Sequence, residues 1–156
     1  MNQSNKKIPS IKIFVAVIII SFLGLADASY LAAKYYSGAI PPCLISGCEA
    51  VTTSKYASIG GISVALMGAI YYLIILGASI AYFDLRKKWM ISFLSKFSII
   101  GLSASLWFIF VQAFLLKAFC LYCIFSAITS ISIFALFFLA KKNNPQPALQ
   151  ENPKGI

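Results

Sequence analysis

The sequence of 156 residues contains no histidine, only four acidic residues and only 11% charged residues. Without histidine, the chain lacks the side chain that most often exchanges protons near neutral pH, so chemistry based on imidazole is excluded. Neither a strand-like alternation of apolar and polar residues nor a G-x-G-x-x-G motif appears, so a nucleotide-binding sheet is not indicated. The scarcity of charge excludes an ordinary soluble domain.

Apolar residues make up 60% of the chain, and the mean hydropathy is +0.88. Three runs, residues 59–83, 97–116 and 118–140, carry no charge and are long enough to cross a bilayer, since a spanning helix needs about 20 apolar residues. A fourth run, from residue 13 to about 31, is interrupted only by Asp27. The pattern predicts an all-α membrane protein, a bundle of four transmembrane helices.

The four runs divide the chain into three parts. We predict a cytoplasmic N-terminal segment at 1–10, a four-helix transmembrane domain at 11–141 with an outer loop at about 34–58, and a disordered cytoplasmic tail at 142–156. A cleaved secretory signal is the alternative for the first span, because Ala26-Asp27-Ala28 fits a small-x-small cleavage site. The topology of the later spans is the same in both cases.

Positive charge is distributed unevenly between the two sides that four spans create. Ten basic residues fall on one side, namely Lys6, Lys7, Lys12, Arg86, Lys87, Lys88, Lys96, Lys141, Lys142 and Lys154, and three on the other, Lys34, Lys55 and Lys117. By the positive-inside pattern, both termini face the cytoplasm and all four cysteines lie at the oxidising outer face. No basic stripe with base-stacking aromatics lies outside the spans, so nucleic-acid binding is not indicated.

The motif Cys120-Leu121-Tyr122-Cys123 stands at the head of the last apolar run. Cysteines at i and i+3 share one face of a helix, with Cβ atoms about 5–6 Å apart, so a modest adjustment closes a disulfide. The helix N-terminus and nearby Lys117 both favour a thiolate over a thiol. A dithiol of low pKa placed against lipid indicates electron exchange with a compound dissolved in the membrane.

The other two cysteines, Cys43 and Cys48, lie in the outer loop. Pro41-Pro42 stiffens the approach to Cys43, and Gly47 allows a tight bend before Cys48. The loop therefore offers a mobile pair that reaches water, while the helix offers a fixed pair. Thiol–disulfide exchange needs only a thiolate, a disulfide and access between them.

The residues after Cys48 predict a short helix at 49–56, capped near Ser46. With Val51 and Tyr56 as apolar anchors, this helix is expected to lie across the mouth of the bundle as a lid.

Other interpretations of the same residues remain open. Four thiolates could form a structural zinc site, although zinc knuckles sit in soluble loops and Cys123 begins an apolar helix, so we predict no metal. Two static disulfides could staple a structural membrane subunit. Asp27 is the only acid inside a predicted span and supports a small four-span proton-coupled transporter as the alternative function. The simpler expectation is an interfacial carboxylate that water or Lys34 satisfies.

The spacing of the cysteines and of several small residues resembles the vitamin K epoxide reductase family, most closely its bacterial members. The matching positions are Cys43, Cys48, Ser54, Gly60-Gly61-Ile62, Gly68, Tyr71-Tyr72 and Cys120-Leu-Tyr-Cys123, within about residues 25–140. The DsbB proteins, which are functionally analogous, carry C-x-x-C in the first outer loop, so the order of the motifs argues against them.

The resemblance implies a membrane thiol–disulfide oxidoreductase of the bacterial inner membrane, with a quinone of the menaquinone or ubiquinone class bound inside the four-helix bundle. By position, Cys123 reduces the quinone, Cys120 is its partner, Cys48 forms a transient disulfide with Cys120, and Cys43 meets a secreted protein. Ser54 matches a family hydroxyl near the quinone. The secreted protein is a DsbA-like thioredoxin-fold protein, expected as a separate chain that acts in trans.

The same roles predict how the fixed pair is exposed and charged. Cys123 is expected to carry its thiolate against the quinone. Cys120, one turn nearer the surface, is expected to be the accessible sulfur of the pair.

Three positions depart from the family pattern. Leu121 replaces a proline that is common in bacterial members, Ser63 replaces a proline after Gly-Ile, and Ala127 replaces a quinone-contacting tyrosine of vertebrate members. The redox potential of the fixed pair, the start of the second span and that quinone contact therefore cannot be transferred from the family.

Overall fold

The computed structural model describes residues 11–42, 47–85 and 88–143. The predicted N-terminal segment at 1–10, the cap at Ser46, Cys43 and the tail beyond residue 143 lie outside the described residues.

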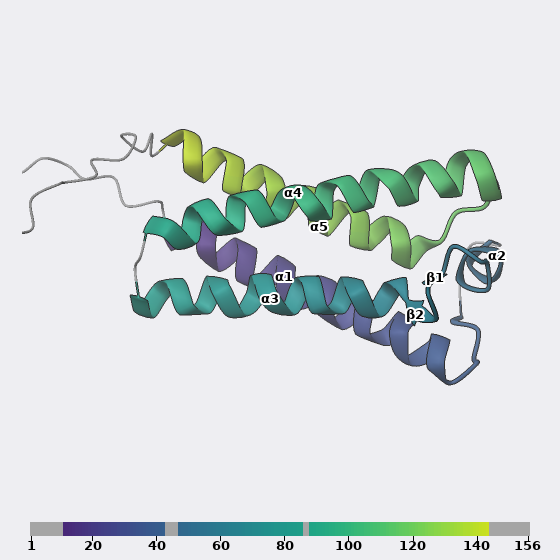
Figure 1. Cartoon of the computed structure of the whole chain (residues 1–156). Helices are drawn as coiled ribbons and strands as arrows, with labels where there is room; N and C mark the ends of the chain where they lie inside the picture. Colours follow the sequence, from purple (N-terminus) through teal and green to yellow (C-terminus); the bar gives the residue numbers. More distant parts are fainter. Residues whose placement is uncertain (1–10, 43–46, 86–87, 144–156) are drawn as a thin grey trace, which may run out of the picture.

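Four long helices form the part of the molecule that the structure describes (Figure 1). They are α1 (Ile11–Tyr36), α3 (Val64–Leu85), α4 (Lys88–Phe110), which continues as the π-helix η1 (Val111–Leu116), and α5 (Leu121–Asn143). Each contains a stretch long and apolar enough to cross a membrane. The predicted all-α bundle of four transmembrane helices is therefore confirmed.

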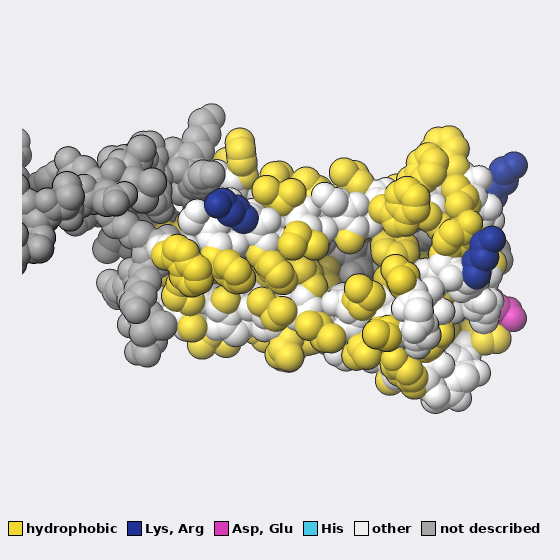
Figure 2. Space-filling model, in the orientation of Figure 1, with side chains coloured by type: hydrophobic (Ala, Val, Ile, Leu, Met, Phe, Trp, Pro, Cys, Tyr) yellow, Lys and Arg dark blue, Asp and Glu magenta, His cyan; other side chains and the backbone are white. Residues whose placement is uncertain are grey.

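The helices pack in a definite order around the bundle. α1 lies against α3 and α5, and α5 lies against α4, whereas α3 and α4 make few contacts with each other. Apolar side chains cover the flank of the bundle, and the charged side chains visible on this face lie towards its two ends (Figure 2). An apolar flank between polar ends is the surface that a bilayer requires.

The tightly packed core occupies the half of the bundle near the start of α1. Phe14, Leu94 and Phe137 are each 1% exposed or less. The Phe14 ring stacks on Tyr82 with the ring centroids 4.2 Å apart and meets Phe137 edge to face. The opposite half, which we call the cysteine end, carries the short helix α2 (Cys48–Thr52) (Figure 1). This half encloses a cavity.

The second span begins at Val64, so the predicted start at residue 59 is wrong. Strands β1 (Ser58–Ile59) and β2 (Ile62–Ser63) instead form a tight antiparallel hairpin. Gly60 and Gly61 form its turn with φ of 61° and 86°, and a two-residue turn with both φ values positive is the form that glycine favours. The glycine pair therefore ends the loop above the helix instead of opening the span.

The predicted boundaries of the third span and of the lid also need correction. α4 begins at Lys88 rather than at residue 97, so Lys96 lies within the helix, exposed on its surface. The lid is a helix of five residues that ends at Thr52, shorter than the predicted 49–56. Its anchor Val51 is buried as predicted, with 9% of its surface exposed.

Candidate active site

The connection between α4 and α5 determines where the last two cysteines lie. Lys117 follows η1 in the left-handed conformation with φ 49°, and residues 118–120 are not helical. α5 therefore begins at Leu121 rather than at residue 118. Cys120 stands directly before the helix, in the N-cap position, where its carbonyl oxygen accepts the Ile124 N–H at 3.0 Å. Cys123 lies in the first turn of the helix.

Gln112, a residue that the sequence pattern did not single out, holds this connection in place. It lies in the π-helix and is only 2% exposed. Its side-chain oxygen accepts the Cys120 N–H at 2.9 Å, and its backbone carbonyl accepts the Ala118 N–H at 3.2 Å. A single π-helical turn inside an α-helix often marks a functional site, and here it aims Gln112 at the backbone of Cys120.

Cys120 and Cys123 are both free thiols, and their hydrogen bonds favour negative charge on Cys120. The Cys123 thiol and the backbone N–H groups of Cys123 and Tyr122 donate to the Cys120 sulfur and lower its pKa to about 7, although burial opposes the shift. A side chain at the N-cap accepts such bonds because the first N–H groups of a helix lack backbone partners. The sequence predicted the thiolate on Cys123, whereas these hydrogen bonds favour it on Cys120.

Cys48 and Cys120 belong to one buried cluster. The cluster joins Cys48 and Val51 of α2 to Cys120, and the side chains of Leu31, Leu116, Ala118, Tyr122 and Cys123 surround it. Cys48 is disulfide-bonded. Cys120 is 0% exposed, so the prediction that it is the accessible sulfur is wrong with respect to water. The cluster that buries it includes Cys48, the residue with which it is predicted to exchange.

Close backbone packing at Gly47 brings the two cysteines together. Gly47 has φ 142°, and a Cβ atom there would lie 3.1 Å from the Phe119 carbonyl oxygen and 3.4 Å from the Ala118 Cβ. The loop therefore rests directly on the residues that precede Cys120. Only glycine combines that backbone angle with that approach.

A second contact holds the entry of the loop beside the fixed pair. The Tyr122 hydroxyl donates to the Pro42 carbonyl at 3.0 Å, and the Tyr122 ring lies 5.6 Å from the ring of Tyr30. Cys43, the next residue after Pro42, lies outside the described part of the chain.

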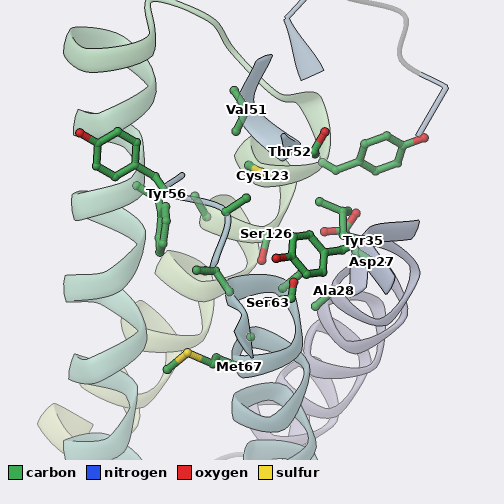
Figure 3. A pocket seen from close by; sticks show the side chains of 18 of the residues that line it. Asp27, Ala28, Tyr35, Val51, Thr52, Tyr56, Ser63, Met67, Cys123 and Ser126 are labelled. Carbon is green, nitrogen blue, oxygen red and sulfur yellow. The ribbon is translucent and has the colours of Figure 1, made fainter. Parts of the chain in front are cut away.

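A cavity of about 610 Å³ opens beneath α2, between the helices. Cys123, Ser54, Asp27 and Ala127 all line it, and Figure 3 shows Cys123 and Asp27 entering it from different helices. The predicted site residues Cys123 and Ser54 are therefore brought together at one cavity. The Ser54 hydroxyl donates to the Val51 carbonyl at 2.8 Å, which leaves its oxygen to accept a further bond.

The cavity wall is largely apolar and carries a few polar groups. The Tyr72 hydroxyl is held by the Ser126 carbonyl at 2.6 Å and by the Thr129 hydroxyl at 2.8 Å. In contrast, one carboxyl oxygen of Asp27 is buried without a hydrogen-bond partner, and Tyr71 and Ser130 also line the cavity. An apolar wall with a few convergent polar atoms fits a flat apolar ring that bears carbonyl oxygens, which is the chemistry of a quinone.

We predict that Cys120 ionises near neutral pH. In a Cys43→Ala, Cys48→Ala background, ultraviolet absorbance of the thiolate should rise with a midpoint near pH 7, because hydrogen bonds lower the pKa of Cys120 to about 7 from an ordinary 9.0. Adding Cys123→Ala removes the main donor and should move the midpoint upward. An unchanged midpoint would show that the Cys123 thiol does not stabilise the charge, and a Cys120→Ser variant identifies the signal.

We also predict that Gln112→Leu destabilises the connection before α5. The change removes the acceptor of the buried Cys120 N–H, and a buried donor left unpaired costs about 1–3 kcal/mol. Thermal unfolding in detergent should therefore shift to lower temperature. Ser103→Leu, an apolar change at an exposed position of α4, serves as the control and should leave the midpoint unchanged. Equal shifts in the two variants would contradict the role of Gln112.

Comparison with known proteins agrees with this geometry. None of the curated proteins compared matches the chain. The model of the vitamin K epoxide reductase family matches residues 15–138, which include α3, α4 and all four cysteines. The chain therefore belongs to the vitamin K epoxide reductase family and is a membrane thiol–disulfide oxidoreductase that uses a quinone.

Proposed function

We propose that the protein oxidises a DsbA-like thioredoxin-fold partner in trans and passes the electrons through Cys43/Cys48 and then Cys120/Cys123 to a membrane quinone, supporting disulfide bond formation. One observation carries the proposal: Cys48 and Cys120 belong to one buried cluster, while Cys123 of the same motif lines the cavity. An arrangement of this kind links a loop that faces water to a site inside the bundle.

The relay consists of two thiol–disulfide exchanges. A partner thiolate attacks the Cys43–Cys48 disulfide at Cys43, and the second partner thiol resolves the mixed disulfide and releases the oxidised partner. The freed Cys48 thiolate attacks Cys120 of the fixed disulfide and releases Cys123. Cys43 then attacks Cys48, which restores the loop disulfide and leaves Cys120 and Cys123 reduced.

The reduced pair, Cys120 and Cys123, can donate two electrons. Cys123 is the sulfur on the cavity wall, so electrons leave the pair there as it closes again to a disulfide. The quinone, when bound, supplies the two-electron acceptor. Cys123 and Ser54 are the residues expected to hold it, and the weak contact between α3 and α4, which both line the cavity, offers a route in from the lipid.

The proposed orientation places the cysteine end on the outer face of the bacterial inner membrane and both termini in the cytoplasm. The start of α1 and the end of α5 lie at the end of the bundle opposite α2, which supports a common side for the termini (Figure 1). A membrane-impermeant thiol reagent should then label the reduced loop pair in intact cells. Labelling that requires an opened cytoplasmic face would contradict this orientation.

Proton-coupled transport through Asp27 is the alternative function. A transporter would tolerate serine at all four cysteine positions, whereas the redox relay would not. Serine variants therefore separate the two functions by growth or activity assays.

A single-turnover experiment tests the proposal directly. The purified Cys43→Ala, Cys48→Ala variant, in which no loop dithiol can reduce the fixed pair again, is reduced, freed of reductant, and mixed without oxygen with one equivalent of a short-chain quinone. Mass spectrometry after alkylation should show Cys120 and Cys123 protected as a disulfide. Persistence of both free thiols would refute electron transfer from this pair, and a Cys123→Ser variant provides the baseline.

A further inference from the structure

The state of the fixed pair leaves the reaction one proton short. Hydrogen bonds lower the pKa of Cys120 to about 7, so above that pH the pair has a thiolate on Cys120, a thiol on Cys123 and a single proton. Closing the pair to a disulfide releases two electrons and that one proton. Forming a quinol from a quinone consumes two electrons and two protons. Another group must therefore supply the second proton.

Asp27 is placed to supply it. It is the only acidic residue in the four predicted spans of the sequence, and it lines the same cavity as Cys123. One of its carboxyl oxygens is buried without a hydrogen-bond partner. The expected pairing with Lys34 is not what the structure favours, because the Lys34 ammonium lies over the Tyr30 ring, 5.6 Å from its centroid. An ionised carboxylate without partners in an apolar wall is costly, and taking up a proton removes that cost.

Charged and titratable groups surround this carboxyl group on several elements. Tyr72 of α3 and Cys120 beside α5 both interact electrostatically with Asp27, as do Tyr122 and Cys123 of α5. Lys34 and Tyr35 of α1 line the cavity towards the cysteine end, and Tyr71 of α3 and Tyr56 of the loop line it as well. Within the described residues, these are the titratable groups that line the cavity or interact electrostatically with Asp27. Asp27 is the one carboxylic acid among them.

We propose that Asp27 is a catalytic acid that donates the second proton to the quinone. This inference rests on the proposed function. As the Cys120 thiolate and the Cys123 thiol join in a disulfide, two electrons and the Cys123 proton pass to the quinone, and the Asp27 carboxylic acid gives the remaining proton. Asp27 is left as a carboxylate, which regains a proton from water at the cysteine end, where oxidation of the partner's thiols releases protons.

The pH dependence of single-turnover quinol formation tests the proposal. In the wild type the rate should rise as the Cys120 thiolate forms and fall at higher pH as the Asp27 acid is lost. Asp27→Asn keeps the size of the side chain but cannot donate this proton, so the rate should drop by at least about tenfold and the falling limb should disappear. Asp27→Glu should recover much of the rate. Glu49→Gln, at an exposed acid of α2 that does not line the cavity, should match the wild type.

A second readout does not depend on the quinone. Infrared difference spectra between the reduced and the disulfide form of the quinone-free protein should contain a carboxylic acid band that responds to the charge on Cys120. This band should be absent in Asp27→Asn and retained in Glu49→Gln. Its presence in both variants would assign the band to another group and overturn the proposal.

The failure of this inference differs from the failure of the proposed function. If the wild type forms quinol, and Asp27→Asn retains either the wild-type rate or the fall in rate at high pH, Asp27 is not the acid. The proposed relay is unaffected by that result. If the reduced wild type transfers no electrons to quinone, the relay itself is wrong.

Discussion

A variant with Cys43→Ala and Cys123→Ser, treated with a mild two-electron oxidant of thiols, should accumulate a disulfide between Cys48 and Cys120. The two cysteines that could attack and resolve this bond, Cys43 and Cys123, are both missing. The bond therefore cannot be broken by exchange within the protein. Cys48 and Cys120 already share one buried cluster, so the bond needs little movement of α2. Mass spectrometry of non-reduced fragments should find the crosslink as the main species of the purified protein.

The matched control is Cys48→Ala with Cys123→Ser, in which Cys43 is the only loop cysteine. That variant should show no crosslink to Cys120. A bond between Cys43 and Cys120 in the control, or no bond in the first variant, would show that the roles within the loop are assigned wrongly.

Gly47→Val should slow electron transfer from the loop to the fixed pair by about 10²-fold. The side chain would meet the backbone of Phe119, with the Cβ atom 3.1 Å from its oxygen and 3.2 Å from its nitrogen, at a φ of 142° that disfavours any residue but glycine. Strain of this kind costs about 1–3 kcal/mol, and about 1.4 kcal/mol corresponds to a tenfold change in rate. The loop would have to lift, carrying Cys48 away from Cys120.

Rapid mixing of the reduced partner with the oxidised protein, followed by acid quenching, measures this step. Gly60→Val is the matched control, since Gly60 also has a positive φ, 61°, but no atom lies within 4 Å of a Cβ placed there. The control should transfer electrons at nearly the wild-type rate. If both variants slow equally, backbone strain rather than the contact with Phe119 explains the effect.

The four spans could be predicted from sequence because a bilayer demands long uncharged helices, and few other patterns supply them. The boundaries were harder, since the apolar Ile59 and Ile62 flank the glycine pair and continue the hydrophobic run into a hairpin. Likewise, nothing in the composition around Lys117 reveals its left-handed backbone, which moves Cys120 from the first turn of a helix to its N-cap.

The sequence predicted those residues of the candidate site that carry reactive groups. The cysteines and Ser54 follow from chemistry and from resemblance, and the structure brings Cys123 and Ser54 to one cavity. Gln112 was missed because its bond to Cys120 joins residues eight apart through a π-helical turn, which no helical periodicity encodes. Asp27 was expected to be satisfied at the interface, and only the packing of α1 against α3 and α5 places it on the cavity wall.

The central claim is that thiols at the cysteine end reduce a quinone. The most direct measurement uses the purified protein in lipid with a reduced thioredoxin-fold donor, and follows quinol by absorbance and oxidised donor by alkylation. We predict catalytic turnover with one quinol formed for each donor oxidised, and none in a variant with serine at all four cysteines. Oxidation of the donor without quinol, or equal quinol in the serine variant, would contradict the account.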